Sequence, residues 1–154
     1  KVGILHFDPF EPVRLRGAAA RKLFKEKGIE IIEDVQGDPA DSTGFAKKTV
    51  LEWLTKYPAG QINGVYAAWD ATVDGAYQAT QEANRQDVFV VGVDGQDFAR
   101  AAVKQGKTWV ATVSQDWKGI AAAAVTAVSD LLTKGTAPAP VITVKGELIT
   151  KANA

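Results

Sequence analysis

Short runs of consecutive apolar residues, rich in valine and isoleucine, recur along the first three quarters of the chain. Because nearly every residue within each run is apolar, the runs are typical of strands buried on both faces of a sheet. Their lengths also suit strands. The predicted strands are Val2–Phe7, Ile29–Val35, Ile62–Ala68, Val88–Val93 and Thr108–Val113.

Segments with helical spacing of apolar positions follow each of these runs. Gly28, Pro58 and Gly135 supply stop signals, and Asp41–Ser42, Asp70 and Asp116 stand where helix N-caps fall. The predicted apolar stripes are Leu15, Ala19, Leu23 and Phe24 in the first helix and Phe45, Val50, Trp53 and Leu54 in the second. The predicted helices are Val13–Lys27, Thr43–Tyr57, Asp70–Asn84, Asp97–Gln105 and Asp116–Lys134.

This alternation of strands and helices predicts an α/β fold, a doubly wound parallel five-stranded sheet with helices on both faces. Right-handed crossovers favour the flavodoxin-like strand order 2-1-3-4-5. The stretch Gly135–Pro140 is predicted to be a surface connector, followed by a short strand at Val141–Val144 and a polar tail.

In open α/β sheets, ligands bind beyond the carboxyl ends of the strands, so we expect the site there. The residues in those segments combine hydrogen-bonding side chains with flat apolar rings, which suits a neutral polyol with hydroxyl groups and C–H faces. The candidate ligand-binding residues are Phe10, Arg14, Trp69, Asp70, Asp94, Gln115 and Trp117.

Each candidate also has a purely structural interpretation. Asp94 could cap the next turn as readily as bind a ligand, and Asp70 is better explained as an N-cap. Gln115 could bond the backbone, and the tryptophans could serve packing. Arg14 favours a ligand role, because a positive charge at a helix start is mildly unfavourable. We place Trp53 and Trp109 in the core or at its edge.

The composition argues against several classes of function. The 154 residues carry 18 basic and 18 acidic side chains, which argues against a general nucleic-acid partner. The chain has no cysteine and a single histidine, His6, expected to be buried within the first strand. It therefore offers no Ser–His–Asp triad, no typical zinc site and no phosphate-binding glycine loop, and we predict no catalytic residue, metal or cofactor. The enzyme alternative is a carboxylate-dependent hydrolase using Asp8, Asp70 and Asp94.

Several motifs in order resemble the ribose-binding-protein-like family, the type I periplasmic substrate-binding proteins of sugar ABC importers. They are PVRLRG, NGVYAAWDATVDGA, VFVVGVDG and ATVSQDWKGIAAAAV, with WLTKYP, LLTKG and the closing ELITKAN. The resemblance runs from Lys1 to the tail. It implies two α/β lobes that close on a sugar, with Arg14, Asp94 and Gln115 as ligand contacts from the C-terminal lobe. Trp69 replaces a residue that is often asparagine in the family, which favours a pentose other than ribose, a hexose or a polyol.

The resemblance also implies a domain organisation and partners. We expect residues 1–115 to form the core of a C-terminal lobe and residues 116–154 to contact an N-terminal lobe. The chain contains no methionine, and we expect that lobe and a signal peptide to precede Lys1. The implied partners are a sugar or polyol, the N-terminal lobe and a membrane permease, in the periplasm or another extracytoplasmic space. The regulatory alternative is the ligand-sensing core of a LacI-type transcription regulator.

Overall fold

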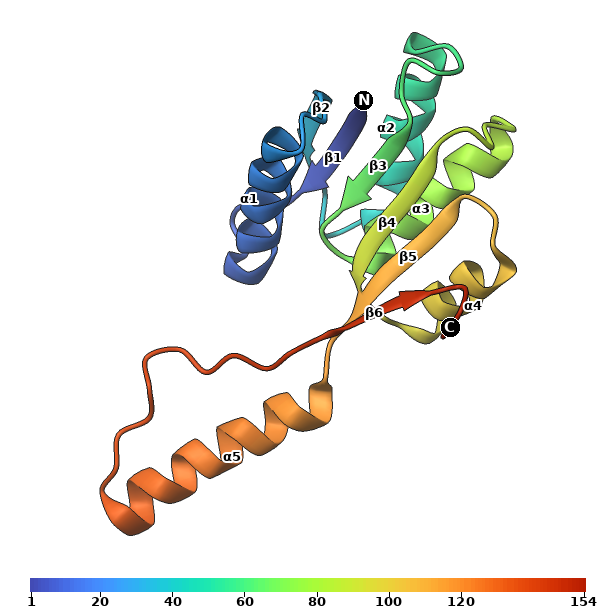
Figure 1. Cartoon of the computed structure of the whole chain (residues 1–154). Coiled ribbons are helices and arrows are strands. Elements are labelled where there is room, and N and C mark those ends of the chain that lie inside the picture. Colours follow the sequence, from blue (N-terminus) through green and yellow to red (C-terminus); the bar gives the residue numbers. More distant parts are fainter.

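The computed structural model describes all 154 residues as one six-stranded sheet with five helices (Figure 1). The strands are β1 (Val2–His6), β2 (Ile31–Gln36), β3 (Gly64–Ala67), β4 (Phe89–Asp94), β5 (Trp109–Ser114) and β6 (Glu147–Thr150). The helices are α1 (Glu11–Glu26), α2 (Ser42–Lys56), α3 (Asp70–Glu82), α4 (Asp97–Gln105) and α5 (Trp117–Lys134).

The predicted fold class and strand order are confirmed, and one strand is added. The sheet order is β2-β1-β3-β4-β5-β6, with β1 to β5 parallel and β6 antiparallel to β5. The predicted strand at Val141–Val144 is wrong, since this segment has no regular structure. Its β-branched residues have strand propensity, but the residues that follow, Glu147–Thr150, occupy the free edge of β5.

The main core lies between the sheet and helices α2, α3 and α4. In α2, Val50, Trp53 and Leu54 are buried as predicted, and Trp109 is fully buried on β5. The stripe predicted for α1 is wrong for three of its four members: Ala19 is exposed, and Leu15 and Leu23 are each 54% exposed. Phe24 alone is half-buried, with its ring edge-on to Tyr66 of β3. The buried face of α1 is instead Val13, Gly17 and Ala20, small side chains that let this helix lie close to β1.

Two of the three predicted N-caps are confirmed. Asp41 accepts a hydrogen bond from Gly44 N at 3.0 Å, and Asp116 accepts one from Gly119 N at 2.9 Å. Asp70 does not cap α3. Trp69 occupies the N-cap position and makes no side-chain cap bond, while Asp70 is already the first helical residue.

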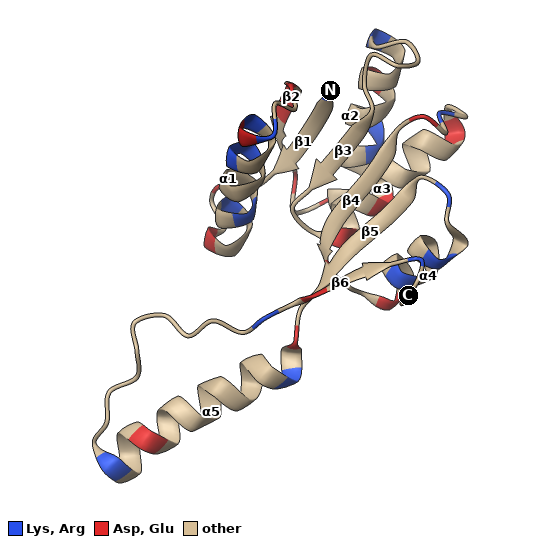
Figure 2. Ribbon diagram, viewed as in Figure 1, with Lys and Arg blue, Asp and Glu red and all other residues tan.

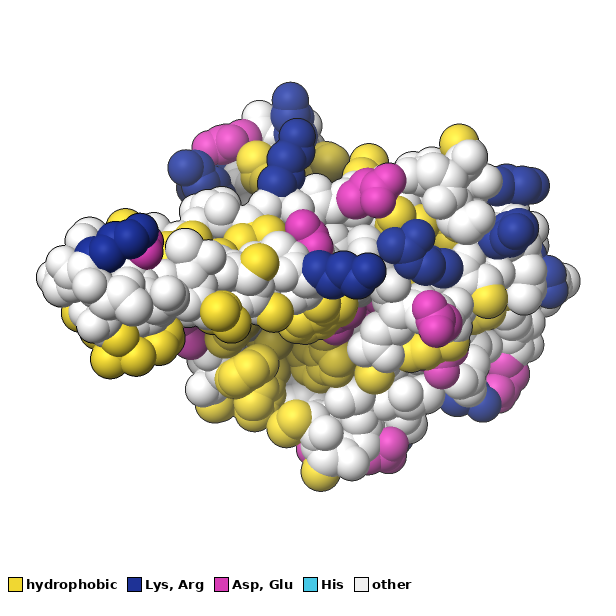
Figure 3. All heavy atoms as spheres, turned by 90° about the horizontal axis from the view of Figure 1, so that it is seen from below, with side chains coloured by type: hydrophobic (Ala, Val, Ile, Leu, Met, Phe, Trp, Pro, Cys, Tyr) yellow, Lys and Arg dark blue, Asp and Glu magenta, His cyan; other side chains and the backbone are white.

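Helix α5 projects away from the sheet, and none of its residues is buried (Figure 1). Charged residues stand only near its two ends, so its middle is uncharged (Figure 2). Its large apolar side chains are exposed, Val125 at 68% and Leu132 at 78%, and yellow side chains line its underside (Figure 3). None of the helices combines the length and hydropathy that crossing a membrane requires.

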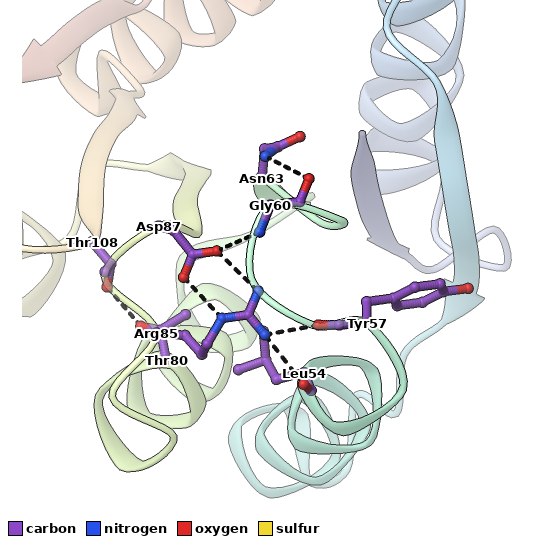
Figure 4. A network of polar contacts seen from close by, with 8 residues as sticks. All are labelled: Leu54, Tyr57, Gly60, Asn63, Thr80, Arg85, Asp87 and Thr108. Atoms are coloured by element: carbon purple, nitrogen blue, oxygen red, sulfur yellow. Dashed lines mark hydrogen bonds and ion pairs between the residues drawn. The ribbon is translucent and has the colours of Figure 1, made fainter.

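A hydrogen-bond network around Arg85 lies at the amino ends of the parallel strands, the end of the sheet away from α5 (Figure 4). Arg85 donates to both carboxylate oxygens of Asp87, at 2.8 and 3.0 Å, and to the carbonyl oxygens of Leu54 and Tyr57 at the end of α2, at 3.2 and 2.8 Å. Asp87 also accepts from Gly60 N at 3.1 Å. This one guanidinium therefore ties the end of α2 to the turn before β4.

The Arg85–Asp87 pair predicts a specific acid sensitivity. The Arg85 guanidinium lowers the pKa of Asp87 to about 2, below its ordinary value of 3.8. A depressed carboxyl pKa stabilises the fold above the unfolded pKa, and this contribution is lost as pH falls from about 4 to about 2. Urea unfolding across this range should show a smaller loss of stability in Asp87→Asn than in the unsubstituted chain. Equal slopes would contradict the assignment.

Candidate functional site

A pocket of about 680 Å³ opens at the carboxyl ends of the parallel strands. Viewed toward this end of the molecule, hydrophobic side chains gather in the recessed surface beside α5 (Figure 3). Five lining residues are hydrophobic, and one arginine and one aspartate supply the charge. The lining residues are Phe7, Pro9, Phe10, Pro12, Val13, Arg16, Pro39, Ser42, Trp69, Asp94, Gln96, Gln115 and Trp117.

The polar side of the pocket is organised around Asp94, at the end of β4. Its Oδ1 accepts from Arg16 Nη1 at 3.0 Å and from Gln115 Nε2 at 2.6 Å. Arg16 Nη1 also donates to the carbonyl oxygen of Ala68 at 2.9 Å. The side chains of Arg16 and Asp94 are only 21% and 14% exposed, so their ion pair is partly shielded from water.

Several hydrogen-bonding groups remain available around this ion pair. No hydrogen bond within the chain uses Oδ2 of Asp94, Nε of Arg16 or Oε1 of Gln115. The three groups offer two acceptors and a donor beside one another, which matches the hydroxyl groups of a polyol. The charges of Arg16 and Asp94 cancel, so the pocket favours an uncharged ligand.

The backbone at Asp94 is strained. Its φ is 134°, in a region that residues other than glycine rarely adopt, and Gly95 follows with φ of 70°. Any Cβ at Gly95 would lie 2.5 Å from Cβ of Ser114. Strain of this kind persists only where surrounding contacts enforce it, and it concentrates at binding sites. The conformation of this turn therefore supports a functional role for Asp94.

The other side of the pocket is aromatic. Trp69, at the end of β3, donates its indole Nε1–H to Ser42 Oγ at 3.2 Å. This bond occupies the only polar group of the ring and leaves its faces apolar. Phe10 and Trp117 are 57% and 61% exposed at the rim. Such rings can pack against the C–H faces of a sugar.

Five of the seven predicted site residues line this pocket: Phe10, Trp69, Asp94, Gln115 and Trp117. Arg14 does not line it. It is exposed on α1 and pairs with Glu11 at 2.7 Å. Arg16 takes the place expected for Arg14. Residues two apart on a helix point about 200° from each other, so only one of the two arginines can face the pocket.

Asp70 also does not line the pocket, because it is fully buried beneath the turn after β4. Its Oδ1 accepts from Thr112 Oγ1 at 2.7 Å, and its Oδ2 accepts from Gln96 N at 3.1 Å. Burial raises the pKa of Asp70, while the bonds from Thr112 and Gln96 oppose that rise. Because Asp70 is buried and both of its carboxylate oxygens are already hydrogen-bonded, it is not placed to contact a ligand in the pocket.

Sequence reasoning missed Arg16, Gln96 and the proline-rich rim. The sequence pattern did not mark Arg16, because only the structure shows that Val13, three residues earlier and near the same helix face, is on the buried side of α1. Gln96 directly follows the VGVDG turn, and its position was therefore foreseeable. Pro9 and Pro39 lie in loops and Pro12 lies in the first turn of α1, and no periodic pattern marks these side chains as lining a pocket.

Two other arrangements are weaker candidates. A groove of similar volume runs along α2, but it is lined mainly by lysine and glutamate side chains and lies at no strand end. The Asp8, Asp70 and Asp94 cluster required by the hydrolase alternative does not form in the pocket. Asp8 bonds His6 Nδ1 at 2.8 Å, Asp70 is buried, and only Asp94 lines the pocket.

Comparison with known proteins identifies the family. The profile of the family described as "Periplasmic binding protein domain" matches residues 4–136. The ribose import binding protein RbsB of Salmonella typhimurium is 32% identical over 112 residues, covering 67% of this chain and 37% of that protein. The Escherichia coli protein of the same name is 31% identical over the same length.

Solved structures agree with this assignment. A periplasmic ribose ABC transporter protein from Conexibacter woesei has a TM-score of 0.87 at 27% identity, covering 99% of this chain and 51% of its own. A periplasmic solute binding protein from Actinobacillus succinogenes, with bound D-allose, has a TM-score of 0.84 at 29% identity, covering 98% of this chain and 53% of its own.

The Lac repressor matches with a TM-score of 0.80 at 20% identity, over 99% of this chain and 55% of its own, a likeness that shows the fold alone. The chain spans about half the length of these solved structures. The family profile and the relatives together confirm the resemblance stated from the sequence. The chain therefore belongs to the periplasmic binding protein family, in its type I, ribose-binding-protein-like group.

Proposed function

We propose that this chain is the C-terminal lobe of the substrate-binding component of a bacterial ABC importer, and that it binds a monosaccharide or polyol. The observation that carries the proposal is Asp94, held on a strained turn by Arg16 and Gln115 at the end of the sheet. The relatives support it, since their names describe ribose import and bound D-allose. Such a protein binds its ligand and performs no chemistry on it.

Each pocket side chain has a distinct role in this proposal. Asp94 Oδ2 accepts hydrogen bonds from ligand hydroxyls, Arg16 donates to a hydroxyl or ring oxygen, and Gln115 contributes its amide oxygen. Trp69 packs against an apolar face of the ligand. Because its N–H is occupied by Ser42, Trp69 cannot donate to a hydroxyl, which favours ligands with a C–H face at this position.

An N-terminal lobe completes the pocket in this proposal. Residues 1–115 form the ligand-binding core, to whose sheet β6 (Glu147–Thr150) returns, and α5 with the segment that follows it contacts that lobe. The exposed apolar side chains of α5 support this, as they are typical of a helix face covered by a partner. One lobe alone supplies only part of the hydrogen bonds and little enclosure, so its sugar affinity is orders of magnitude weaker than that of the closed protein.

The proposed setting is the periplasm or another extracytoplasmic space. The matching family profile is that of a periplasmic binding protein domain, and the relatives are ribose import binding proteins, which supports this setting. In this proposal, the protein delivers its ligand to a membrane permease. Closure of the two lobes then buries the sugar and presents one continuous surface to the permease.

Two arginines offer a direct test of the pocket. Arg16→Ala should weaken binding of the best sugar by about 10-fold or more, because a charged hydrogen-bond donor is lost and Asp94 loses its partner. Arg14→Ala, two residues away and exposed, is the matched control and should leave affinity within about twofold. Calorimetry against a panel of pentoses, hexoses and polyols measures both. A larger effect at Arg14 than at Arg16 would overturn the pocket assignment.

A further inference from the structure

In the turn after β4, every backbone N–H and C=O group from Asp94 O to Gln96 N makes a hydrogen bond. Asp94 O accepts from Gln115 N at 3.2 Å, and Gly95 N donates to Thr112 Oγ1 at 3.3 Å. Gly95 O accepts from Arg100 Nε at 3.1 Å, and Gln96 N donates to Asp70 Oδ2 at 3.1 Å. These bonds explain how the chain maintains a φ of 134° at Asp94.

Two of these bonds connect the turn to the buried carboxylate of Asp70, one through the Thr112 hydroxyl and one directly. Thr112 Oγ1 accepts from Gly95 N and donates to Asp70 Oδ1 at 2.7 Å, so the hydroxyl relays the turn to Asp70. The second oxygen of Asp70 holds the next amide, at Gln96. Asp70 is 0% exposed and Thr112 is 1% exposed, so water cannot replace either partner without opening the core.

We propose that Asp70, acting with Thr112, is a positioning residue that fixes the Asp94–Gly95–Gln96 turn from beneath and so sets the ligand-binding orientation of the Asp94 carboxylate. This inference rests on the proposed function for its ligand, but its structural content can be measured without one. Asp70 would then support the site although its carboxylate does not line the pocket.

The chemistry of Asp70 makes the role specific to a carboxylate. Both oxygens act as acceptors, one for a hydroxyl and one for an amide N–H. An asparagine has one acceptor and must turn its NH₂ toward the other donor, so it cannot reproduce both bonds. Because burial disfavours the charged form of Asp70, Asp70→Asn also removes a desolvation penalty and need not destabilise the fold.

The experiment uses a pair of substitutions at Thr112, one substitution at Asp70 and a control at Thr80, which lies on the same helix as Asp70. Thr112→Val removes the hydroxyl at nearly constant shape, whereas Thr112→Ser keeps it. Asp70→Asn tests the carboxylate. Thr80→Val is the control, because Thr80 is a buried threonine of α3 that bonds Thr108 Oγ1 at 2.6 Å at the amino end of the sheet. Thermal unfolding reports stability for each variant.

Amide hydrogen exchange of Gly95 and Gln96 in the ligand-free chain is the first readout. Thr112→Val and Asp70→Asn should speed exchange at these two amides by about 10-fold, while Thr112→Ser and Thr80→Val should leave it unchanged. Unchanged exchange in both Thr112→Val and Asp70→Asn would overturn the positioning role, whatever the chain binds.

Calorimetric sugar affinity is the second readout. Thr112→Val and Asp70→Asn should weaken binding of the best sugar about 10-fold, with Thr112→Ser within about twofold and Thr80→Val altering stability alone. A merely structural role would instead lower the unfolding temperature and leave affinity unchanged, and that result would overturn the inference. Because one lobe alone binds sugar weakly, NMR titration replaces calorimetry where the affinity is too low for heat to be measured. If the unsubstituted chain shows no saturable sugar binding by either method, the proposed function fails, and the exchange readout alone decides the positioning of the turn.

Discussion

Asp94→Ala is expected to weaken binding of the best sugar by about 100-fold or more. Hydrogen bonds to charged groups contribute about 1.5–3 kcal/mol each, and an aspartate that accepts from two ligand hydroxyls loses both. The substitution also leaves the Arg16 guanidinium without its carboxylate partner in a partly shielded position. Calorimetry with the best ligand of the panel measures the loss.

Two further variants separate the causes of that loss. Asp97→Ala removes an exposed carboxylate three residues away and should leave affinity nearly unchanged. Asp94→Asn keeps the shape and tolerates the positive φ, but it replaces one acceptor oxygen by a donor, so its loss should be intermediate. Full affinity in Asp94→Ala would remove Asp94 from the site.

Gly75→Ala is expected to lower the stability of the fold through a single added methyl group. Gly75 lies on α3 where this helix meets α2, and a Cβ there would overlap the carbonyl oxygen of Thr43 and lie 2.8 Å from Lys47 N. Backbone atoms cannot move aside as a side chain can. Overpacking of this kind costs about 1–3 kcal/mol, and the gain in helix propensity, about 1 kcal/mol, offsets only part of it.

Gly44→Ala is the matched control for this substitution in the partner helix. There the three atoms nearest to a Cβ would all belong to the Asp41 carboxylate, which can rotate away. The expected change is small, because a weakened N-cap is offset by better helix propensity. Urea unfolding of both variants checks the comparison. Equal stability of the two variants would contradict the close approach of α2 and α3.

The order of elements was predictable because buried parallel strands and capped helices leave strong local patterns. The apolar runs located β1 to β5, and Asp41 and Asp116 marked two helix starts that the structure confirms. The sixth strand was not predictable by the same reasoning. Glu147–Thr150 is a short edge strand with mixed polarity, and its pairing depends on the exposed edge of β5.

The site was predictable in place and only partly in residues. Strand ends converge in a parallel sheet, so Trp69, Asp94 and Gln115 could be expected near one another. The choice between Arg14 and Arg16 depended on the rotation of α1 about its axis. The apolar stripe indicated the wrong rotation, because the buried face of α1 consists of small residues rather than leucines.

Asp70 shows a different limit of sequence reasoning. Its position before a helix predicted an N-cap, yet its bonds go to Thr112 and to Gln96 N, which are 42 and 26 residues away along the chain. Contacts of that range depend on sheet register and helix packing. No local pattern contains them.

Binding of a neutral sugar or polyol in the pocket at the strand ends can be followed residue by residue by amide and indole NMR of this chain during sugar titrations. We expect saturable shifts at Gly95, Gln96 and Gln115 and at the indole N–H groups of Trp69 and Trp117, with none along the lysine-lined groove of α2. The absence of saturable shifts at the pocket with every sugar and polyol of the panel, or shifts confined to α2, would contradict this binding.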